Sequence, residues 1–110
     1  MTYVFGMEAD LFKALADPTR RGVFERLSRE GELSVGDITR GAGVSQPAVS
    51  QHLAALRLAG LVTEQKVGRN VRYRARAEGL APLMNWMSLY GAFWNERFDR
   101  LETLLNEMDR

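Results

Sequence analysis

The side chains best suited to specific polar contacts lie together in residues 44–60, which read VSQPAVSQHLAALRLAG. They are Ser45, Gln46, Ser50, Gln51 and His52. Their hydroxyl, amide and imidazole groups can both donate and accept hydrogen bonds. No acidic residue occurs between Ser45 and Leu61. The stretch therefore offers hydrogen bonding without negative charge.

The composition argues against an enzyme. The chain contains no cysteine, which excludes disulfides, thiolate metal sites and cysteine nucleophiles. It contains a single histidine, His52, which is too little for a clustered imidazole site or a catalytic base with partners. The sequence shows no nucleophile–base pair, phosphate loop or set of metal ligands. We therefore predict a protein that is not an enzyme, with no cofactor and no metal site.

An apolar row predicts that the polar stretch is a helix. Its members recur at intervals of four, three and four residues, which is helical periodicity: Val49, Leu53, Leu56 and Gly60. Ser45 is a suitable N-cap, and Pro47 falls in the first turn, where its missing N–H is tolerated. Gln51 projects nearly opposite the apolar row, whereas His52 lies only about one residue's rotation from it. The helix can thus bury one face and expose the other.

Three further helices are expected before this one. The first covers residues 7–16, and the second runs from Pro18 to about Arg29, with Asp17 as its N-cap. Ser34 can cap a brief third helix, which ends in a turn containing Gly41 and Gly43. Two helices joined by such a turn predict a helix-turn-helix over about residues 34–60.

A β-hairpin is expected next, at about residues 61–76. Two alternating stretches, residues 61–66 and 70–75, flank a turn that contains Gly68. Its basic residues are Lys66, Arg69, Arg72, Arg74 and Arg76, and no acid occurs between Lys66 and Arg76. Such charges have two possible roles: to keep an edge strand soluble, or to contact a polyanion. We favour the second interpretation for Lys66, Arg69 and Arg72, with Arg69 at the tip.

The C-terminal region, residues 80–108, is expected to be mostly helical, with an interruption near Pro82. Alternating spacings of three and four residues form a heptad seam: Met84, Met87, Gly91, Trp94, Phe98, Leu101, Leu105 and Met108. A core helix satisfied within one subunit is the alternative, but the apolar face exceeds what a small monomer can cover. We therefore predict a homodimer, with the first helix contributing. The predicted interface is Leu11, Phe12, Leu15, Met87, Tyr90, Trp94, Phe98, Leu101, Leu105 and Met108.

Four segments, in order, resemble the ArsR family of dimeric winged-helix repressors. They are DPTR (17–20), ELSVGDI (32–38), SQPAVSQHL (45–53) and LAGLV (58–62). The resemblance covers roughly residues 7–76. It implies a mainly α fold with a β-hairpin (α+β), a winged helix-turn-helix that dimerises through its terminal helices. It also implies a sequence-specific transcriptional regulator, a homodimeric repressor of a palindromic operator in double-stranded DNA.

On this interpretation the helix after Ser45 enters the major groove, and the hairpin contacts the backbone. Gln51 can pair with adenine, whereas His52 is a structural or phosphate-positioning residue in preference to a base reader. Arg57 can reach phosphate or merely be solvated. The predicted DNA-binding residues are Thr19, Ser34, Ser45, Gln46, Pro47, Ser50, Gln51, His52, Arg57, Lys66, Arg69 and Arg72.

The chain departs from the metal-sensing members of that family. The positions that match their cysteines are Ser34 and Gly36, and the last helix contains no histidine. We therefore expect a non-metal-sensing type, whose effector the sequence does not identify. The aromatic residues near Trp86 could line a ligand pocket, but dimer packing is favoured. The rival function is a winged-helix module that binds proteins without binding DNA.

The chain is expected to form a single cytoplasmic domain, residues 1–110. Its formal net charge is only +1, so the local distribution of charge matters more than the total. No apolar run approaches the roughly 18 residues that span a bilayer. The N-terminal residues lack the basic start and long apolar stretch of a signal peptide. No membrane association is expected.

Overall fold

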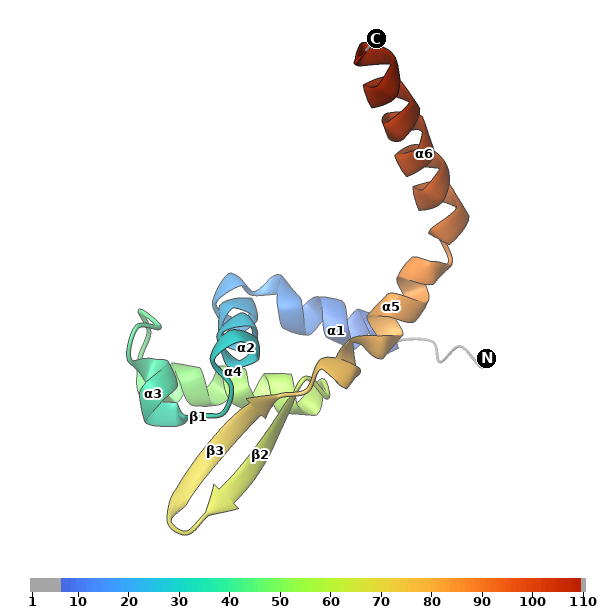
Figure 1. The fold of residues 1–110 in the computed structure, drawn as a ribbon. Coiled ribbons are helices and arrows are strands. Elements are labelled where there is room, and N and C mark those ends of the chain that lie inside the picture. Colours follow the sequence, from blue (N-terminus) through green and yellow to red (C-terminus); the bar gives the residue numbers. More distant parts are fainter. Residues whose placement is uncertain (1–6, 110) are drawn as a thin grey trace.

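The computed structural model describes residues 7–109, in a winged helix-turn-helix arrangement with a projecting C-terminal helix (Figure 1). The helices are α1 (Met7–Ala16), α2 (Pro18–Glu30), α3 (Val35–Thr39), α4 (Gln46–Leu58), α5 (Ala81–Ser88) and α6 (Gly91–Met108). The strands are β1 (Leu33–Ser34), β2 (Val62–Val67) and β3 (Asn70–Ala75), and a 3₁₀ turn, η1 (Ala77–Leu80), precedes α5. Mainly helical with one hairpin, the fold agrees with the sequence-based prediction.

The core is formed where α1 to α4 meet the base of the hairpin. Its buried side chains include Leu11, Ala14, Val23, Phe24, Leu27, Ile38, Val49, Leu53, Leu56, Leu61 and Val62. The predicted caps set the helix boundaries. Asp17 accepts a hydrogen bond from the Arg20 amide at 2.9 Å, and Ser34 and Asp37 form a reciprocal capping box at α3. Local capping therefore determines where α2 and α3 begin.

The turn between α3 and α4 is held by a side chain that sequence reasoning did not identify. Arg26, on α2, donates from Nη1 to the carbonyl oxygens of Ile38 at 2.9 Å and Arg40 at 2.8 Å. These carbonyls lie at the C-terminal end of α3, where helix geometry leaves them without backbone partners. Gly41 follows with φ of +90°, a conformation that favours glycine.

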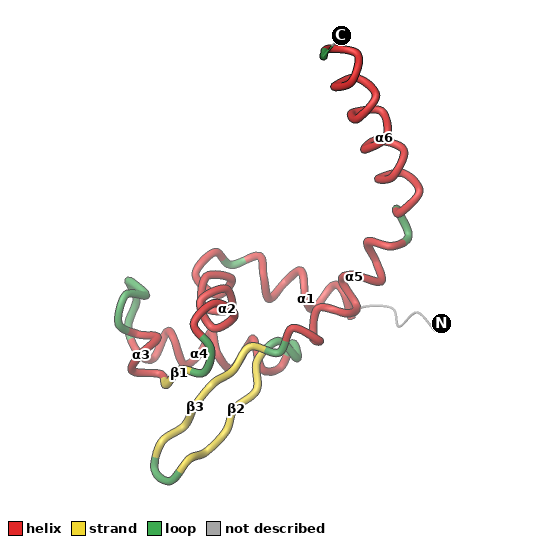
Figure 2. The backbone as a smooth tube through the Cα atoms, viewed as in Figure 1, coloured by secondary structure: helices red, strands yellow, loops and turns green. Residues whose placement is uncertain are grey.

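The hairpin belongs to a three-stranded antiparallel sheet with the order β1-β3-β2 (Figure 2). The short strand β1 was not predicted, because two residues are too few for an alternating pattern. It pairs Leu33 with Tyr73 and Ser34 with Arg72. The register Val67↔Asn70 leaves Gly68 and Arg69 as a two-residue turn, so Val67 lies in β2 and not in the turn as predicted. We refer to residues 62–75 as the wing.

The C-terminal region is interrupted at a different place from the one predicted. Pro82 lies in the first turn of α5, where it is tolerated, and the break falls at Leu89 and Tyr90. There the amides of Leu89 and Tyr90 bond three residues back, to Trp86 and Met87, which ends α5. Gly91, a poor helix former, then begins α6.

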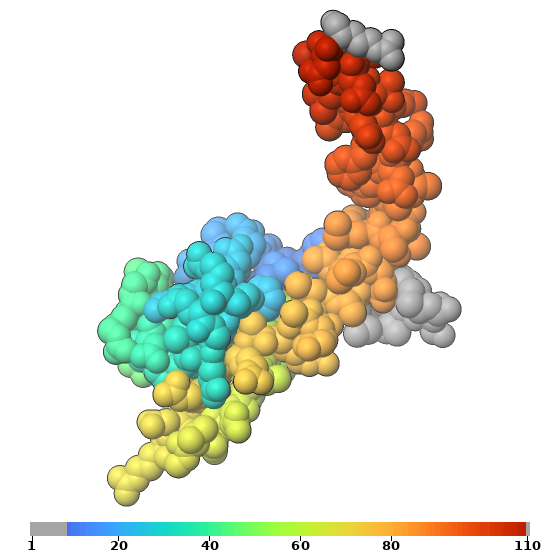
Figure 3. Space-filling view, viewed as in Figure 1, coloured from blue at the N-terminus to red at the C-terminus, as the bar shows by residue number. Residues whose placement is uncertain are grey.

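We refer to α5 and α6 (residues 81–108) as the C-terminal arm. Helix α5 packs beside α1, and α6 extends away from the body, as the space-filling view also shows (Figures 1 and 3). The described chain has a radius of gyration of 18.4 Å, whereas a compact domain of this size has one of about 13 Å. The side chains of residues 92–109 are exposed throughout. The chain's own core therefore does not cover α6.

The arm is joined to the end of α4 by a close backbone contact. Gly79, in η1, packs directly against Gly60 and Leu61, and a Cβ atom at residue 79 would lie 2.8 Å from the Gly60 carbonyl carbon. Two hydrogen bonds from Arg76 reinforce the joint: its amide donates to the Leu61 carbonyl at 2.7 Å and its Nη1 to the Gly60 carbonyl at 3.2 Å. The position of the arm is thus coupled to the helix-turn-helix.

Candidate nucleic-acid interface

Helix α4 presents the exposed polar face that its sequence predicted. The side chains of Val49, Leu53 and Leu56 have no exposed surface, so the apolar row faces the core. Ser45 caps the helix by accepting a hydrogen bond from the Ala48 amide at 3.3 Å. The exposed residues of the cap and the helix are Ser45, Gln46, Pro47, Ser50, Gln51, Ala54, Arg57 and Leu58. A convex helix with exposed hydroxyl and amide groups can hydrogen-bond base edges in a major groove.

His52 is partly buried and has a protein partner. Its Nδ1 accepts a hydrogen bond from Nε of Arg20, at the start of α2, at 3.4 Å. The Arg20 amide hydrogen bond lowers the pKa of Asp17, and the charge of the Arg20 guanidinium contributes in the same direction. His52 therefore connects α4 to the N-terminus of α2. Arg20 is a residue of this region that the sequence-based prediction missed.

Arg57 is placed against an acidic residue. Its Nη1 lies 3.4 Å from Oε2 of Glu64, on β2, so its guanidinium bridges α4 and the wing. Glu64 is the register partner of Tyr73, whose pKa is raised by burial and, to a lesser degree, by the Glu64 carboxylate. The Arg57 side chain is still 52% exposed, so solvation agrees with this conformation and phosphate contact stays a prediction.

The wing projects its basic residues from the body. Lys66 and Arg69 are exposed, and Arg69 lies in the turn between β2 and β3, at the tip of the wing. Arg72 is half-buried beside Ser34. The hydrogen bonds from the Ser34 amide and hydroxyl lower the pKa of Asp37 most, and the charges of Arg40 and then of Arg72 contribute in the same direction. Lys66, Arg69 and Arg74 are therefore the exposed cations of the wing, whereas Arg72 is half-buried.

Thr19 and Ser34 are both half-buried. Ser34 Oγ accepts a hydrogen bond from the Asp37 amide at 3.1 Å, so its main role here is to cap α3. Thr19 lies near the start of α2, beside Arg20. Both positions are compatible with a flanking role at the polar face of α4, and the Ser34 hydroxyl is also needed to cap α3.

Most of the predicted dimer residues form an exposed apolar face along the arm. The exposed members, on α5, α6 and the link between them, are Met87, Tyr90, Trp94, Phe98, Leu101, Leu105 and Met108. Phe12, on α1, is 43% exposed and packs edge-to-face on Trp86 with ring centroids 5.2 Å apart. Leu11, however, is 1% exposed in the core, so its assignment to the interface is wrong. Leu15 is partly buried against the same core.

The error at Leu11 has a simple geometric reason. Leu11 and Phe12 are neighbours in sequence but lie 100° apart around α1. Leu11 therefore faces α2 and the core, whereas Phe12 faces α5. The apolar face extends along the arm to α1 through Phe12.

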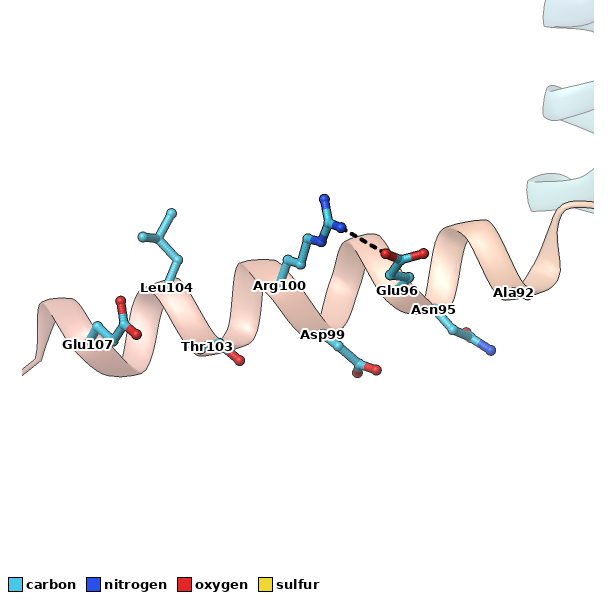
Figure 4. Close-up of a pocket in the computed structure, with 8 residues that line it drawn as sticks. All are labelled: Ala92, Asn95, Glu96, Asp99, Arg100, Thr103, Leu104 and Glu107. Atoms are coloured by element: carbon cyan, nitrogen blue, oxygen red, sulfur yellow. Dashed lines mark hydrogen bonds and ion pairs between the residues drawn. The ribbon is translucent and has the colours of Figure 1, made fainter.

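The opposite side of α6 is polar. A shallow hollow there is lined entirely by residues of α6, including Asn95, Asp99, Thr103 and Arg100, which pairs with Glu96 at 2.8 Å (Figure 4). Because a single helix supplies the whole lining, this feature is a helix surface and not an enclosed ligand pocket. Within residues 7–109, no helix is both long and apolar enough to cross a membrane.

A helix-turn-helix followed by a two-stranded wing defines the class of winged helix-turn-helix proteins. A family model described as a helix-turn-helix domain matches residues 15–65. The chain is 47% identical over 70 residues to the arsenical resistance operon repressor of Escherichia coli, an alignment that covers 64% of this chain and 60% of the repressor. The chain spans less than two thirds of the length of this relative and of two other curated regulators that match it.

Solved structures resemble most of the chain. An ArsR-like transcriptional regulator from Rhodococcus sp. RHA1 has a TM-score of 0.72 and 33% identity, covering 91% of this chain and 93% of that one. A homodimeric winged helix-turn-helix DNA-binding domain from Mycobacterium bovis has a TM-score of 0.62 and 29% identity, covering 78% and 79%. The chain belongs to the ArsR family of winged helix-turn-helix transcriptional regulators.

Proposed function

We propose that this regulator is a cytoplasmic repressor that binds a palindromic operator in double-stranded DNA as a homodimer. The observation that carries the proposal is the exposed, acid-free polar face of α4, placed beside a wing with free cations at its tip. The names of its relatives, which include operon repressors, support repression. The relatives also favour this function over a protein-binding winged helix.

Base reading is assigned to the exposed face of α4. Gln51 projects from the side opposite the buried row, where its amide can form two hydrogen bonds with adenine. Gln46 and Ser50 flank it, and Pro47 and Ala54 allow close approach. Phosphate contact is assigned to Lys66 and Arg69 of the wing, with Thr19, Ser34 and Arg72 nearer the body.

Replacement of Gln51 by alanine should weaken operator binding by about 1–3 kcal/mol and leave non-specific binding unchanged. The fold should survive, because Gln51 is exposed and packs against nothing in the core. Fluorescence anisotropy with operator and with scrambled duplex measures both affinities. Asn95→Ala, which removes an exposed amide from α6, is the matched control and should change neither. Equal weakening on both duplexes would show that Gln51 does not read bases.

Replacement of Arg69 by alanine should weaken operator and scrambled DNA alike and reduce the slope of log affinity against log salt by about one. The reason is that a phosphate contact releases counterions whatever the sequence. Arg100→Ala removes the same charge from the arm, where Arg100 pairs with Glu96, and should leave the slope unchanged. If Arg69→Ala keeps the wild-type slope, the wing does not contact phosphate.

The effector to which this regulator responds is proposed not to be a soft metal ion. The chain has no cysteine, and its single histidine is bonded to Arg20 on the DNA-facing part of the molecule. Soft-metal sensor sites require thiolates or clustered imidazoles. Operator affinity should therefore stay constant when micromolar zinc is added and then chelated. A reproducible tenfold change that chelator reverses would contradict this inference.

Dimerisation is assigned to the apolar face of the arm. Exposed apolar surface of this extent marks an interaction site, because monomers rarely leave such a surface in water. A second copy supplies an equal and complementary face under two-fold symmetry. The solved structure from M. bovis, a homodimer, supports dimerisation itself. Two copies would place two α4 helices on half-sites about one DNA turn apart.

A further inference from the structure

The contact between Arg20 and His52 joins two helices that are far apart in sequence. Nε of Arg20 donates to Nδ1 of His52 at 3.4 Å, and both side chains are partly buried. The backbone of Arg20 is itself fixed, since its amide donates to the capping carboxylate of Asp17 at 2.9 Å. Arg20 therefore approaches His52 from a rigid position at the N-terminus of α2.

This hydrogen bond has a direct consequence for the proton on the imidazole. Arginine has only donors, so Nδ1 of His52 must be the acceptor in the contact. A neutral imidazole that accepts at Nδ1 carries its proton at Nε2. The geometry thus selects the Nε2–H tautomer of His52.

The Nε2 atom is available to a partner outside the chain. In the part of the chain that the structure describes, the only hydrogen bond of the His52 imidazole is the one at Nδ1. Among the same residues, no buried side-chain nitrogen or oxygen lacks a partner. Nε2 therefore remains in contact with solvent, on the helix that carries Ser50 and Gln51.

We propose that Arg20 is a positioning residue that holds His52 in the Nε2–H tautomer, so that α4 presents an N–H donor to a hydrogen-bond acceptor on DNA. A phosphate oxygen and a guanine edge share this acceptor chemistry. The proposal rests on the proposed DNA-binding function. It differs from a purely structural role, because it fixes which group the imidazole offers to the nucleic acid.

The first test is spectroscopic and requires no DNA. Because the chain contains one histidine, a long-range ¹H–¹⁵N correlation spectrum shows a single imidazole, recorded where that ring is neutral. We expect the Nε2–H pattern in the wild type. In Arg20→Met the ¹⁵N chemical shifts of Nδ1 and Nε2 should move toward each other, as they do when two tautomers exchange. Arg21→Met is the control: it removes the charge of the next arginine, whose Nη1 donates to the Leu15 carbonyl and not to His52. This substitution should leave the pattern unchanged. The Nδ1–H pattern in the wild type, or identical spectra for wild type and Arg20→Met, would overturn the proposal.

The second test measures binding. Arg20→Met should weaken operator binding roughly three- to tenfold more than Arg21→Met does, which is the effect of one lost hydrogen bond. In a His52→Gln background the two substitutions should have equal effects, since Arg20 then has no imidazole to position. Equal effects in the wild-type background would overturn the DNA part of the proposal. A wild type that prefers no sequence would refute the proposed function, while the spectra would still decide what Arg20 does to His52.

Discussion

Replacement of Leu101 by aspartate should convert the dimer to a monomer and reduce operator affinity by roughly 10²–10⁴-fold. Leu101 lies in the middle of the apolar face of α6 and is 50% exposed in the isolated chain. Burying an unpaired carboxylate against a second copy of this face would be strongly unfavourable. The operator affinity falls when the dimer is lost, because each half-site then lacks the effective concentration that the second subunit provides.

The matched control for this substitution is Thr103→Asp, on the polar side of the same helix (Figure 4). It adds the same charge at an exposed position, so the dimer and the operator affinity should both persist. Sedimentation velocity at several concentrations measures the oligomeric state of each variant. An intact Leu101→Asp dimer would place the interface elsewhere on the molecule.

Replacement of Gly79 by alanine should lower the free energy of unfolding by about 3 kcal/mol, near the upper end of the usual cost of overpacking. The added Cβ would lie 2.8 Å from the Gly60 carbonyl carbon and 3.2 Å from the Leu61 Cα. Both are backbone atoms, so no side chain can rotate away to make room. Urea denaturation followed by circular dichroism measures the loss.

Gly22→Ala is the control for this effect. Gly22 lies within α2, and a Cβ there meets nothing within 4 Å. Alanine is the better helix former, so this variant should be more stable than the wild type by about 0.5–1 kcal/mol. A Gly79→Ala variant as stable as the wild type would mean that the arm is not tightly joined to the end of α4.

The helices of the body could be predicted because their signals are local. Caps such as Asp17 and Ser34 lie next to the residues they cap, and the apolar row of α4 repeats at helical spacing. The exposed face of α4, and the partial burial of His52, followed from the same periodicity. These features depend on one segment at a time.

Features that depend on two distant segments were missed. Strand β1 exists only because β3 lies beside it, and Arg26 closes the α3–α4 turn from a different helix. The ion pair between Arg57 and Glu64 was not predicted, because only the fold brings Glu64 close to α4. Arg20 was overlooked for the same reason.

The C-terminal seam shows where a periodic pattern is insufficient. The heptad spacing continues unbroken through Gly91, yet the helix breaks at Leu89 and Tyr90. The spacing records which residues are apolar, whereas the break depends on backbone hydrogen bonding and on the weak helix propensity of glycine. The exposed apolar face survives the break, and α5 remains packed beside α1.

Selection from a pool of random DNA duplexes by the purified wild-type protein tests the central claim most directly. A homodimer that reads DNA with two α4 helices should enrich an inverted repeat whose half-site centres are about 10 base pairs, or 34 Å, apart. Gln51→Ala should lose that enrichment and still retain duplexes non-specifically. Recovery of no preferred sequence, or of a single half-site without its symmetric mate, would contradict the account.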